Sequence, residues 1–260
     1  MTATVAGPRP ARYVEQIMGM PVSLALRGSH TDDDLARVAW RRVCASLRSA
    51  DRVFSTYRRD SAVSRLDRGE LALADCPPEV GEVLALGEAA RRDSGGAFDV
   101  RRRGGLDPSG VVKGWAVERA AAALAALPDT DFCLSAGGDL TCRTLHPHDP
   151  PWRIGVEDPH DPGGLVAVVP IHTGAVATSG TARRGPHVVD ARTGLAPVGL
   201  ASVTVVGDSL TAVDIAATAA FALGAAAAGI WLADRGHRGL LVDTDGTLRP
   251  VGPEKKGRTT

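Results

Sequence analysis

The chain has 260 residues, 44% of them hydrophobic, so it is long enough to bury a core as one large domain or two small ones. Its formal net charge is zero, which excludes the strong basic field of a nucleic-acid-binding or membrane-surface protein. Its four cysteines, Cys44, Cys76, Cys133 and Cys142, form no C-x-x-C pair and no zinc-ligand spacing, and we expect reduced thiols.

No segment of the sequence predicts export or membrane insertion. The first 20 residues lack the charged start and apolar core of a secretory signal. The longest apolar region, 212–233, consists largely of alanine and contains Asp214, which argues against a bilayer span. We therefore expect a cytoplasmic protein with no nucleic-acid partner and no membrane insertion, and leave its oligomeric state open.

The first half of the chain is predicted to be mainly helical. A strand at 22–28 precedes a helix over 31–50, whose apolar residues recur at helical spacing. A second helix is expected at 78–92, with proline near its start and glycines after its end. A short extended piece at 97–100 leads through a glycine-rich loop to a third helix at 111–127, which stops before a proline.

The second half is predicted to consist mainly of strands. Two helices, 210–223 and 225–235, and a final hairpin over 239–250 that turns at Asp245-Gly246 follow the strands. Turn residues separate the seven predicted strands, which are FCLSA, DLTCRT, WRIGVE, LVAVVPIH, AVATS, HVVD and ASVTVV. This order favours an α+β fold with mixed or antiparallel sheets and flanking helices over a regular parallel αβ repeat.

We predict one folded unit. It should extend over residues 12–250, between a flexible N-terminus at 1–11 and a flexible polar tail at 251–260.

The only lysine outside the tail follows a loop that could bind an anion. In LDPSGVVKGWAVERA, Asp107, Ser109 and Gly110 precede a predicted helix, and Lys113 lies in its first turn. Backbone amides at a helix start favour phosphate, and lysine supplies a compact ammonium. The P-loop pattern is missing, and the local sequence favours a helix capped by Asp or Ser with an exposed lysine over a phosphate site.

Two further stretches contain residues with a structural and a functional interpretation. Phe54 and Tyr57 in FSTYRRDSAVSRL could pack in the core or stack on a planar ligand. His187 precedes Asp190 by three residues in GPHVVDARTG, and in a strand their side chains would face opposite sides. His187 could be a general base or a structural histidine.

The stretch TAVDIAATAAF places two oxygen-bearing side chains on one face of an apolar helix. Asp214 and Thr218 are four residues apart. Thr211 and Asp214 also match the S/T-x-x-D/E capping box, and Thr218 could return its hydroxyl to a backbone carbonyl. The local sequence leaves a capping role and a ligand role open.

Nine stretches occur in a fixed order from about Met18 to Gly224: MGM, FSTYRRDSAVSRL, GGAFDV, LDPSGVVKGWAVERA, SAGGDL, VATSG, HVVDARTG, SVTVV and AVDIAATAAFALG. In this order they resemble the ApbE family, the FAD:protein FMN transferases. The resemblance implies magnesium-dependent transfer of FMN from FAD to a threonine or serine hydroxyl of an acceptor flavoprotein, with release of AMP. It also implies a duplicated ββααββ fold.

The resemblance assigns roles residue by residue. His187 would assist proton removal from the acceptor hydroxyl. Magnesium would bind the carbonyl of Gly110 and the side chains of Asp214 and Thr218. The residues at FAD-contacting positions would be Met18, Tyr57, Ala97, Phe98, Asp99, Asp107, Lys113 and Val189.

Other functions fit the same residues. The chain could be an FAD pyrophosphatase that gives FMN and AMP with water as acceptor, or a non-catalytic FAD-binding protein. The second alternative gains support from the seven residues between Asp99 and Asp107, where the family usually has a much longer insert. A generic nucleotide-binding domain would rest only on the glycine-rich loops.

Overall fold

The computed structural model describes residues 11–102, 104–181 and 188–252. Eight strands form one sheet in the order β1-β2-β5-β6-β9-β10-β11-β12, and every neighbouring pair is antiparallel. Their bounds are β1 Ala11–Ile17, β2 Met20–Gly28, β5 Thr130–Ala136, β6 Asp139–Arg143, β9 Gly174–Gly180, β10 Leu200–Gly207, β11 Arg238–Asp243 and β12 Leu248–Val251.

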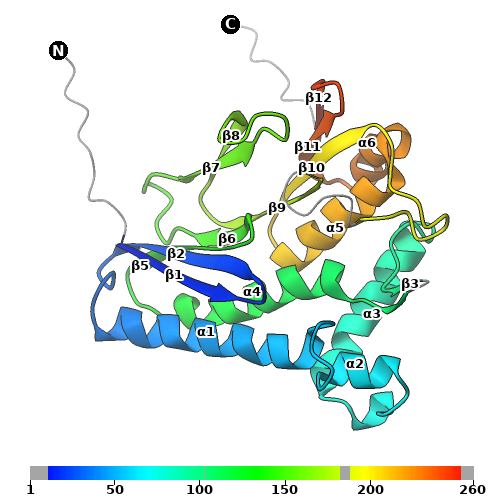
Figure 1. Ribbon diagram of the computed structural model, residues 1–260. Helices are drawn as coiled ribbons and strands as arrows, with labels where there is room; N and C mark the ends of the chain where they lie inside the picture. Colours follow the sequence, from blue (N-terminus) through cyan, green and yellow to red (C-terminus); the bar gives the residue numbers. More distant parts are fainter. Residues whose placement is uncertain (1–10, 103, 182–187, 253–260) are drawn as a thin grey trace, which may run out of the picture.

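The helices pack on one face of this sheet and bury most of the core. The long helix α1 extends beneath β1 and β2 in Figure 1. Buried Leu24, Leu134 and Val205 face the helices from three strands. The helices are α1 Asp34–Phe54, α2 Ala62–Asp67, α3 Pro78–Asp93, α4 Ser109–Ala125, α5 Leu210–Leu223 and α6 Ala225–Asp234, with a short 3-10 turn, η1, at Leu73–Asp75. None of the described helices has the length and apolar character needed to cross a membrane.

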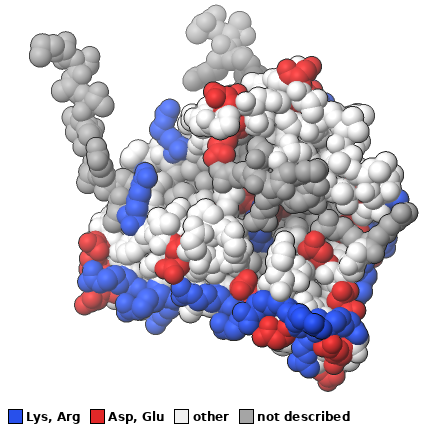
Figure 2. Space-filling view, in the orientation of Figure 1, with Lys and Arg blue, Asp and Glu red and all other residues white. Residues whose placement is uncertain are grey.

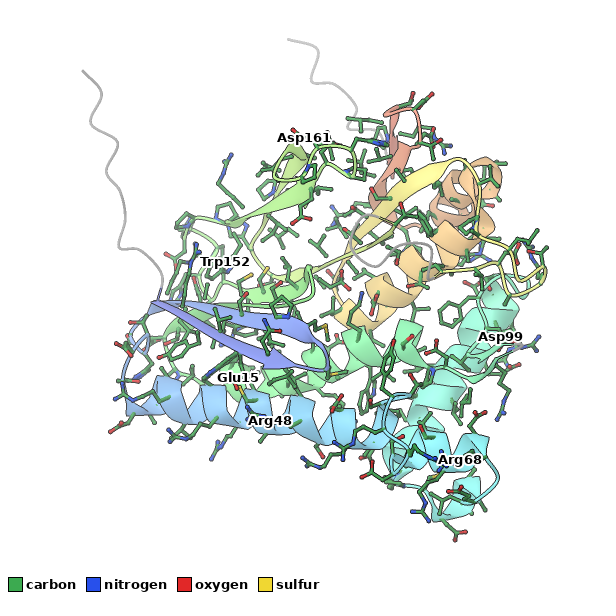
Figure 3. All side chains as sticks on the ribbon, in the orientation of Figure 1. Glu15, Arg48, Arg68, Asp99, Trp152 and Asp161 are labelled. Atoms are coloured by element: carbon green, nitrogen blue, oxygen red, sulfur yellow. The ribbon has the colours of Figure 1, made fainter. Side chains whose placement is uncertain are left out.

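The outer surface of α1 and α2 is strongly charged. Arginine side chains gather along the lower edge of the view, with acidic residues among them (Figure 2). An ion pair links α1 to the sheet: the guanidinium of Arg48 lies 2.7 Å from the carboxylate of Glu15 in β1 (Figure 3). Helix α1 therefore has a solvated arginine-rich face and an apolar face that packs in the core.

A separate hairpin covers the other face of the sheet. It consists of β7 Trp152–Glu157 and β8 Leu165–Ile171, drawn at the top of Figure 1. Trp152 and Ile171 at its base pack on a second apolar cluster that includes Val176 of β9. The Arg27 guanidinium lies 3.9 Å from the ring centre of Trp152, which is labelled in Figure 3. The hairpin is thus anchored at its base and extends over the sheet.

The short strands β3 Arg101–Arg102 and β4 Gly105–Leu106 form a third sheet just before α4. Helix α4 then packs closely on α5 where it contains Gly114. A Cβ at this position would lie 2.7 Å from the carbonyl oxygen of Leu210 and 2.8 Å from Cβ of Asp214. The missing side chain therefore sets the distance between the two helices.

The predicted α+β fold with antiparallel strands and flanking helices is confirmed. The helices predicted at 78–92, 210–223 and 225–235 correspond to α3, α5 and α6. The duplication of a ββααββ unit stays a prediction.

The extended piece predicted at 97–100 is wrong, and so is the strand predicted at 187–190 in its described part. Residues 97–100 form a bend, because Phe98 N donates to Ser94 Oγ at 3.0 Å. In the described part of the stretch 187–190, only Asp190 forms an isolated bridge, with Leu195.

The prediction lacked β1 and α2, besides the very short η1, β3 and β4. Strand β1 lies at the sheet edge and includes Glu15 and the exposed Val14, so its apolar alternation is weak. Helix α2 has six residues and is capped by Ser61, whose Oγ accepts from Ser64 N at 3.1 Å. Helical periodicity needs a longer segment to become visible.

Gly114→Ala should lower the free energy of unfolding by about 1–3 kcal/mol, because the methyl group overpacks the contact between α4 and α5. Urea denaturation measures this change. The control is Gly81→Ala in α3, where a Cβ meets nothing within 4 Å. That variant should be more stable by about 0.5–1 kcal/mol. Equal effects of the two substitutions would show that Gly114 is not a close-packing position.

Candidate active site

The start of α5 is capped by Ser209, not by Thr211. Ser209 Oγ accepts from Ala212 N at 3.2 Å. Thr211 N donates at 3.0 Å to Glu118 Oε2 of α4, and the Thr211 hydroxyl donates to the same oxygen. The capping-box interpretation of Thr211 and Asp214 is therefore wrong. Asp214 lies inside the helix, and its carboxylate makes contacts outside it.

Three charged side chains meet where α4, α5 and β6 converge. Lys113 Nζ lies 3.2 Å from Asp214 Oδ1 and forms a second ion pair with Asp139 Oδ2. Both aspartates are 1% exposed. A buried carboxylate requires a counter-charge and hydrogen bonds, and Lys113 supplies the charge for both.

Backbone amides hold the other oxygen of each carboxylate. Gly114 N donates to Asp214 Oδ2 at 2.8 Å, and Thr178 N of β9 donates to Asp139 Oδ1 at 2.9 Å. Each carboxylate therefore has one oxygen fixed by the backbone and one oxygen directed toward the ammonium. This arrangement restricts both side chains to a single orientation.

Burial and charge act in opposite directions on this cluster. Burial raises the pKa of Asp214, while Lys113 favours its ionised form. Burial also disfavours the ammonium of Lys113, but Asp214 and Asp139 together outweigh burial and raise the pKa of Lys113 above its ordinary value. Lys113 is therefore charged at neutral pH.

Hydroxyl and backbone groups lie one turn further along α5. Thr218 Oγ1 is 3.1 Å from Ser179 Oγ of β9. A Cβ on Gly110 would lie 2.9 Å from the ring of Phe98 and 3.4 Å from Cγ2 of Thr218. Gly110 thus allows the backbone at the start of α4 to come close to Thr218.

These groups line a cleft of about 470 Å³, a size typical of small-molecule sites. Strand β7 contributes Ile154, Val156 and Glu157 to the lining. The residues predicted for the site that line this cleft are Ala97, Phe98, Asp99, Asp107, Gly110, Lys113, Val189, Asp214 and Thr218. Asp99 lies on the segment between α3 and β3 (Figure 3). The fold thus brings together residues from distant parts of the sequence.

Two predicted site residues that the structure describes, Met18 and Tyr57, do not belong to this lining. Met18 is in the β1–β2 turn, next to the lining residues Gly19 and Met20, with φ of 56°. Tyr57 follows α1, and its side chain is 98% exposed away from the cleft lining. His187 lies outside the described residues.

Sequence reasoning did not predict the roles of Asp139 and Ser179. Asp139 follows Gly137 and Gly138, and the stretch SAGGDL is typical of a strand end with a glycine turn. The signal available in the sequence was a carboxylate directly after two glycines, at the start of a predicted strand. The ion-pair partner of Asp139, Lys113, is distant in sequence, and a local sequence pattern does not reveal a contact between distant residues.

The donors in the cleft suit a hard divalent cation. Asp214 and Thr218 supply a carboxylate and a hydroxyl from one face of α5. The backbone of α4 comes close to Thr218 at Gly110. Magnesium prefers oxygen ligands and keeps some of its waters. Within the described residues, no group of three or more His, Cys, Asp and Glu side chains is arranged to hold a metal.

Comparison with known families identifies one that spans the chain. The ApbE family model matches residues 18–103 and 100–242. An FAD:protein FMN transferase from Rhodobacter capsulatus is 33% identical over 163 residues, which are 59% of this chain and 31% of the relative. A Haemophilus influenzae protein of the same name is 29% identical over 131 residues, 46% of this chain and 38% of the relative. The chain thus spans about a third of the length of these curated relatives.

Solved structures show the same fold. The ApbE protein from Thermotoga maritima superposes with a TM-score of 0.83 at 20% identity, covering 94% of this chain and 97% of the other. The apo flavinyl transferase ApbE from Pseudomonas stutzeri gives a TM-score of 0.78 at 23% identity, covering 95% and 97%.

Ser209→Ala should lower the free energy of unfolding by about 0.5–2 kcal/mol, because α5 loses its N-cap. Ser49→Ala, at an exposed position inside α1, is the control and should change stability by less than about 0.5 kcal/mol. Chemical denaturation of both variants provides the measurement. If Ser209→Ala proves as stable as the parent chain, Ser209 is not the cap of α5.

Proposed function

The chain belongs to the ApbE family, and we propose that it transfers FMN from FAD to a threonine or serine hydroxyl of an acceptor flavoprotein, with release of AMP. The observation that carries the proposal is the buried cluster of Lys113, Asp139 and Asp214 in a cleft beside Thr218. A cleft that combines an ammonium, carboxylates and a hydroxyl can hold a pyrophosphate together with its metal ion.

Magnesium would be held by Asp214, Thr218 and the carbonyl of Gly110. This donor set combines one charged and two neutral oxygens, which leaves coordination positions for substrate phosphate and water. When bound, the metal would neutralise charge that develops on the phosphate oxygens. The geometry that supports this assignment is the close approach of Gly110 to Thr218 described above.

The remaining residues would position the substrate. Lys113 would balance the charge of the pyrophosphate as well as that of the carboxylates. The N-terminal end of α4, at Ser109 and Gly110, forms part of the cleft lining, and helix N-termini favour phosphate groups. Phe98 and Val189 provide apolar surface for a flavin or adenine ring.

The proposed reaction exchanges one phosphorus–oxygen bond for another. The acceptor hydroxyl oxygen bonds to the phosphorus of the FMN half of FAD. The bond from that phosphorus to the bridging oxygen breaks, and AMP leaves with the bridging oxygen. The hydroxyl proton passes to a base, for which we propose His187. The same cleft could use water as acceptor, so acceptor labelling and AMP release must be measured together.

The test is incubation of the purified chain with FAD, magnesium and a candidate acceptor flavoprotein. The proposal predicts acid-stable flavin fluorescence on the denatured acceptor and an equal amount of AMP. AMP without acceptor labelling would indicate hydrolysis. Stoichiometric FAD binding without AMP would indicate a flavin-binding protein.

Asp214→Asn should reduce AMP release and acceptor labelling by at least about 100-fold, because it removes the charged metal ligand. The amide can still accept from Gly114 N, so the circular dichroism spectrum should stay that of the parent. Asp243→Asn is the control, since Asp243 pairs with Arg249 on the β11–β12 hairpin. If Asp214→Asn folds and turns over at the parent rate, Asp214 is not the charged metal ligand.

His187→Ala should slow transfer to the acceptor by about 100-fold or more, the usual contribution of a general base. Its dissociation constant for FAD should change much less. Stopped-flow labelling and equilibrium fluorescence titration give the two quantities. A weakening of FAD binding that equals the loss of rate would mean that His187 contributes to binding and is not a base.

A further inference from the structure

Lys113 lies where two buried carboxylates each direct one oxygen toward it. Asp214 Oδ1 is 3.2 Å from Nζ, and Asp139 Oδ2 is its second ion-pair partner. The backbone already holds the opposite oxygens, through Gly114 N and Thr178 N. The ammonium therefore occupies the position of a cation shared by two fixed anions.

Asp214 cannot keep this contact and also act as a metal ligand without cost. A divalent cation at Asp214 Oδ1 would lie close to the ammonium of Lys113, and like charges in a buried site repel strongly. Asp139 offers a second position, because it belongs to β6 and pairs with the same ammonium as Asp214 of α5. Among the described residues, its Oδ2 atom has the ion pair with Lys113 and no further hydrogen-bond partner, so its buried charge depends on Lys113.

We propose that Lys113 is an internal cation that a divalent cation displaces from Asp214, and that Asp139 is the positioning residue that retains Lys113 after this exchange. The inference rests on the function proposed above and adds a role for Asp139, which sequence reasoning did not identify. Asp139 acts on the metal site through Lys113, without contact to the reacting atoms.

The exchange changes the sign of the local charge. Two carboxylates and one ammonium carry a formal charge of −1, which disfavours a pyrophosphate. Addition of a divalent cation gives +1, because Asp139 keeps the ammonium in the cleft. Cation binding should therefore promote FAD binding, and by linkage FAD should increase cation affinity to the same degree.

Titration with Mn²⁺ in the absence of FAD tests the exchange, with electron paramagnetic resonance to count free cation. Lys113→Gln should lower the dissociation constant for Mn²⁺ by about tenfold, because the competing ammonium is gone, and Asp139→Asn should raise it by about tenfold. In the Lys113→Gln background, Asp139→Asn should have a clearly smaller effect than in the parent chain. With Mn²⁺ present, Lys113→Gln should bind FAD more weakly than the parent.

Two variants serve as matched controls. Arg119→Gln removes another cation from α4, one that pairs with Glu82. Asp131→Asn removes another buried, ion-paired aspartate from the same β5–β6 hairpin, whose partner is Arg27. Both should leave the dissociation constant for Mn²⁺ within about twofold of the parent, since surface ion pairs and distant charges contribute little.

The outcomes distinguish the inference from the proposed function. If Lys113→Gln binds Mn²⁺ no tighter than the parent, the exchange is refuted. If Asp139→Asn weakens binding equally in both backgrounds, Asp139 acts through its own charge and not through Lys113, and its role as the positioning residue of Lys113 is refuted. If the parent binds no Mn²⁺, or Asp214→Asn binds it as well as the parent, the metal site itself is refuted. If Asp139→Asn does not fold, the dissociation constant of Lys113→Gln for Mn²⁺ still tests whether the cation displaces Lys113.

Discussion

The close approach of α4 and α5 at Gly114 is the constraint on which the candidate site depends. Because this residue has no side chain, its amide reaches the carboxylate of Asp214, and the preceding Lys113 is placed against the same carboxylate. Glu118, one turn further along α4, fixes the start of α5 through Ser209 and Thr211. Two helices distant in sequence thus act as one rigid support for the charged cluster.

Burial gives this cluster its chemical character. Two buried aspartates require pairing with the partly exposed Lys113 and backbone hydrogen bonds to offset the cost of desolvation. The sheet supplies part of this support, since Asp139 is held by an amide of the neighbouring strand β9. The β7–β8 hairpin then forms a wall of the cleft on the other face of the sheet. A cleft that joins buried carboxylates to a partly exposed ammonium suits chemistry on a pyrophosphate.

The sequence carried enough information to predict the fold class, most helices and nine of the residues that line the cleft. The family resemblance contributed most, because Asp99, Lys113 and Asp214 have no local pattern that would bring them together. Local pattern alone suggested that Asp214 caps its helix, whereas Ser209 has that role. The role of Asp139 was not predicted, because it depends on an ion pair between a strand and a helix that is distant in sequence. Tyr57 shows that a family resemblance can also mislead. It matches an FAD-contacting position of the family, yet its side chain is exposed and does not line the cleft.

The most direct measurement is the anomalous scattering of Mn²⁺ in crystals grown with Mn²⁺ and FAD. A peak within ligand distance of Asp214 and Thr218, with Lys113 Nζ moved toward Asp139, is the predicted result. A peak remote from α5, or a Lys113 that keeps its contact with Asp214 beside the metal, would contradict it.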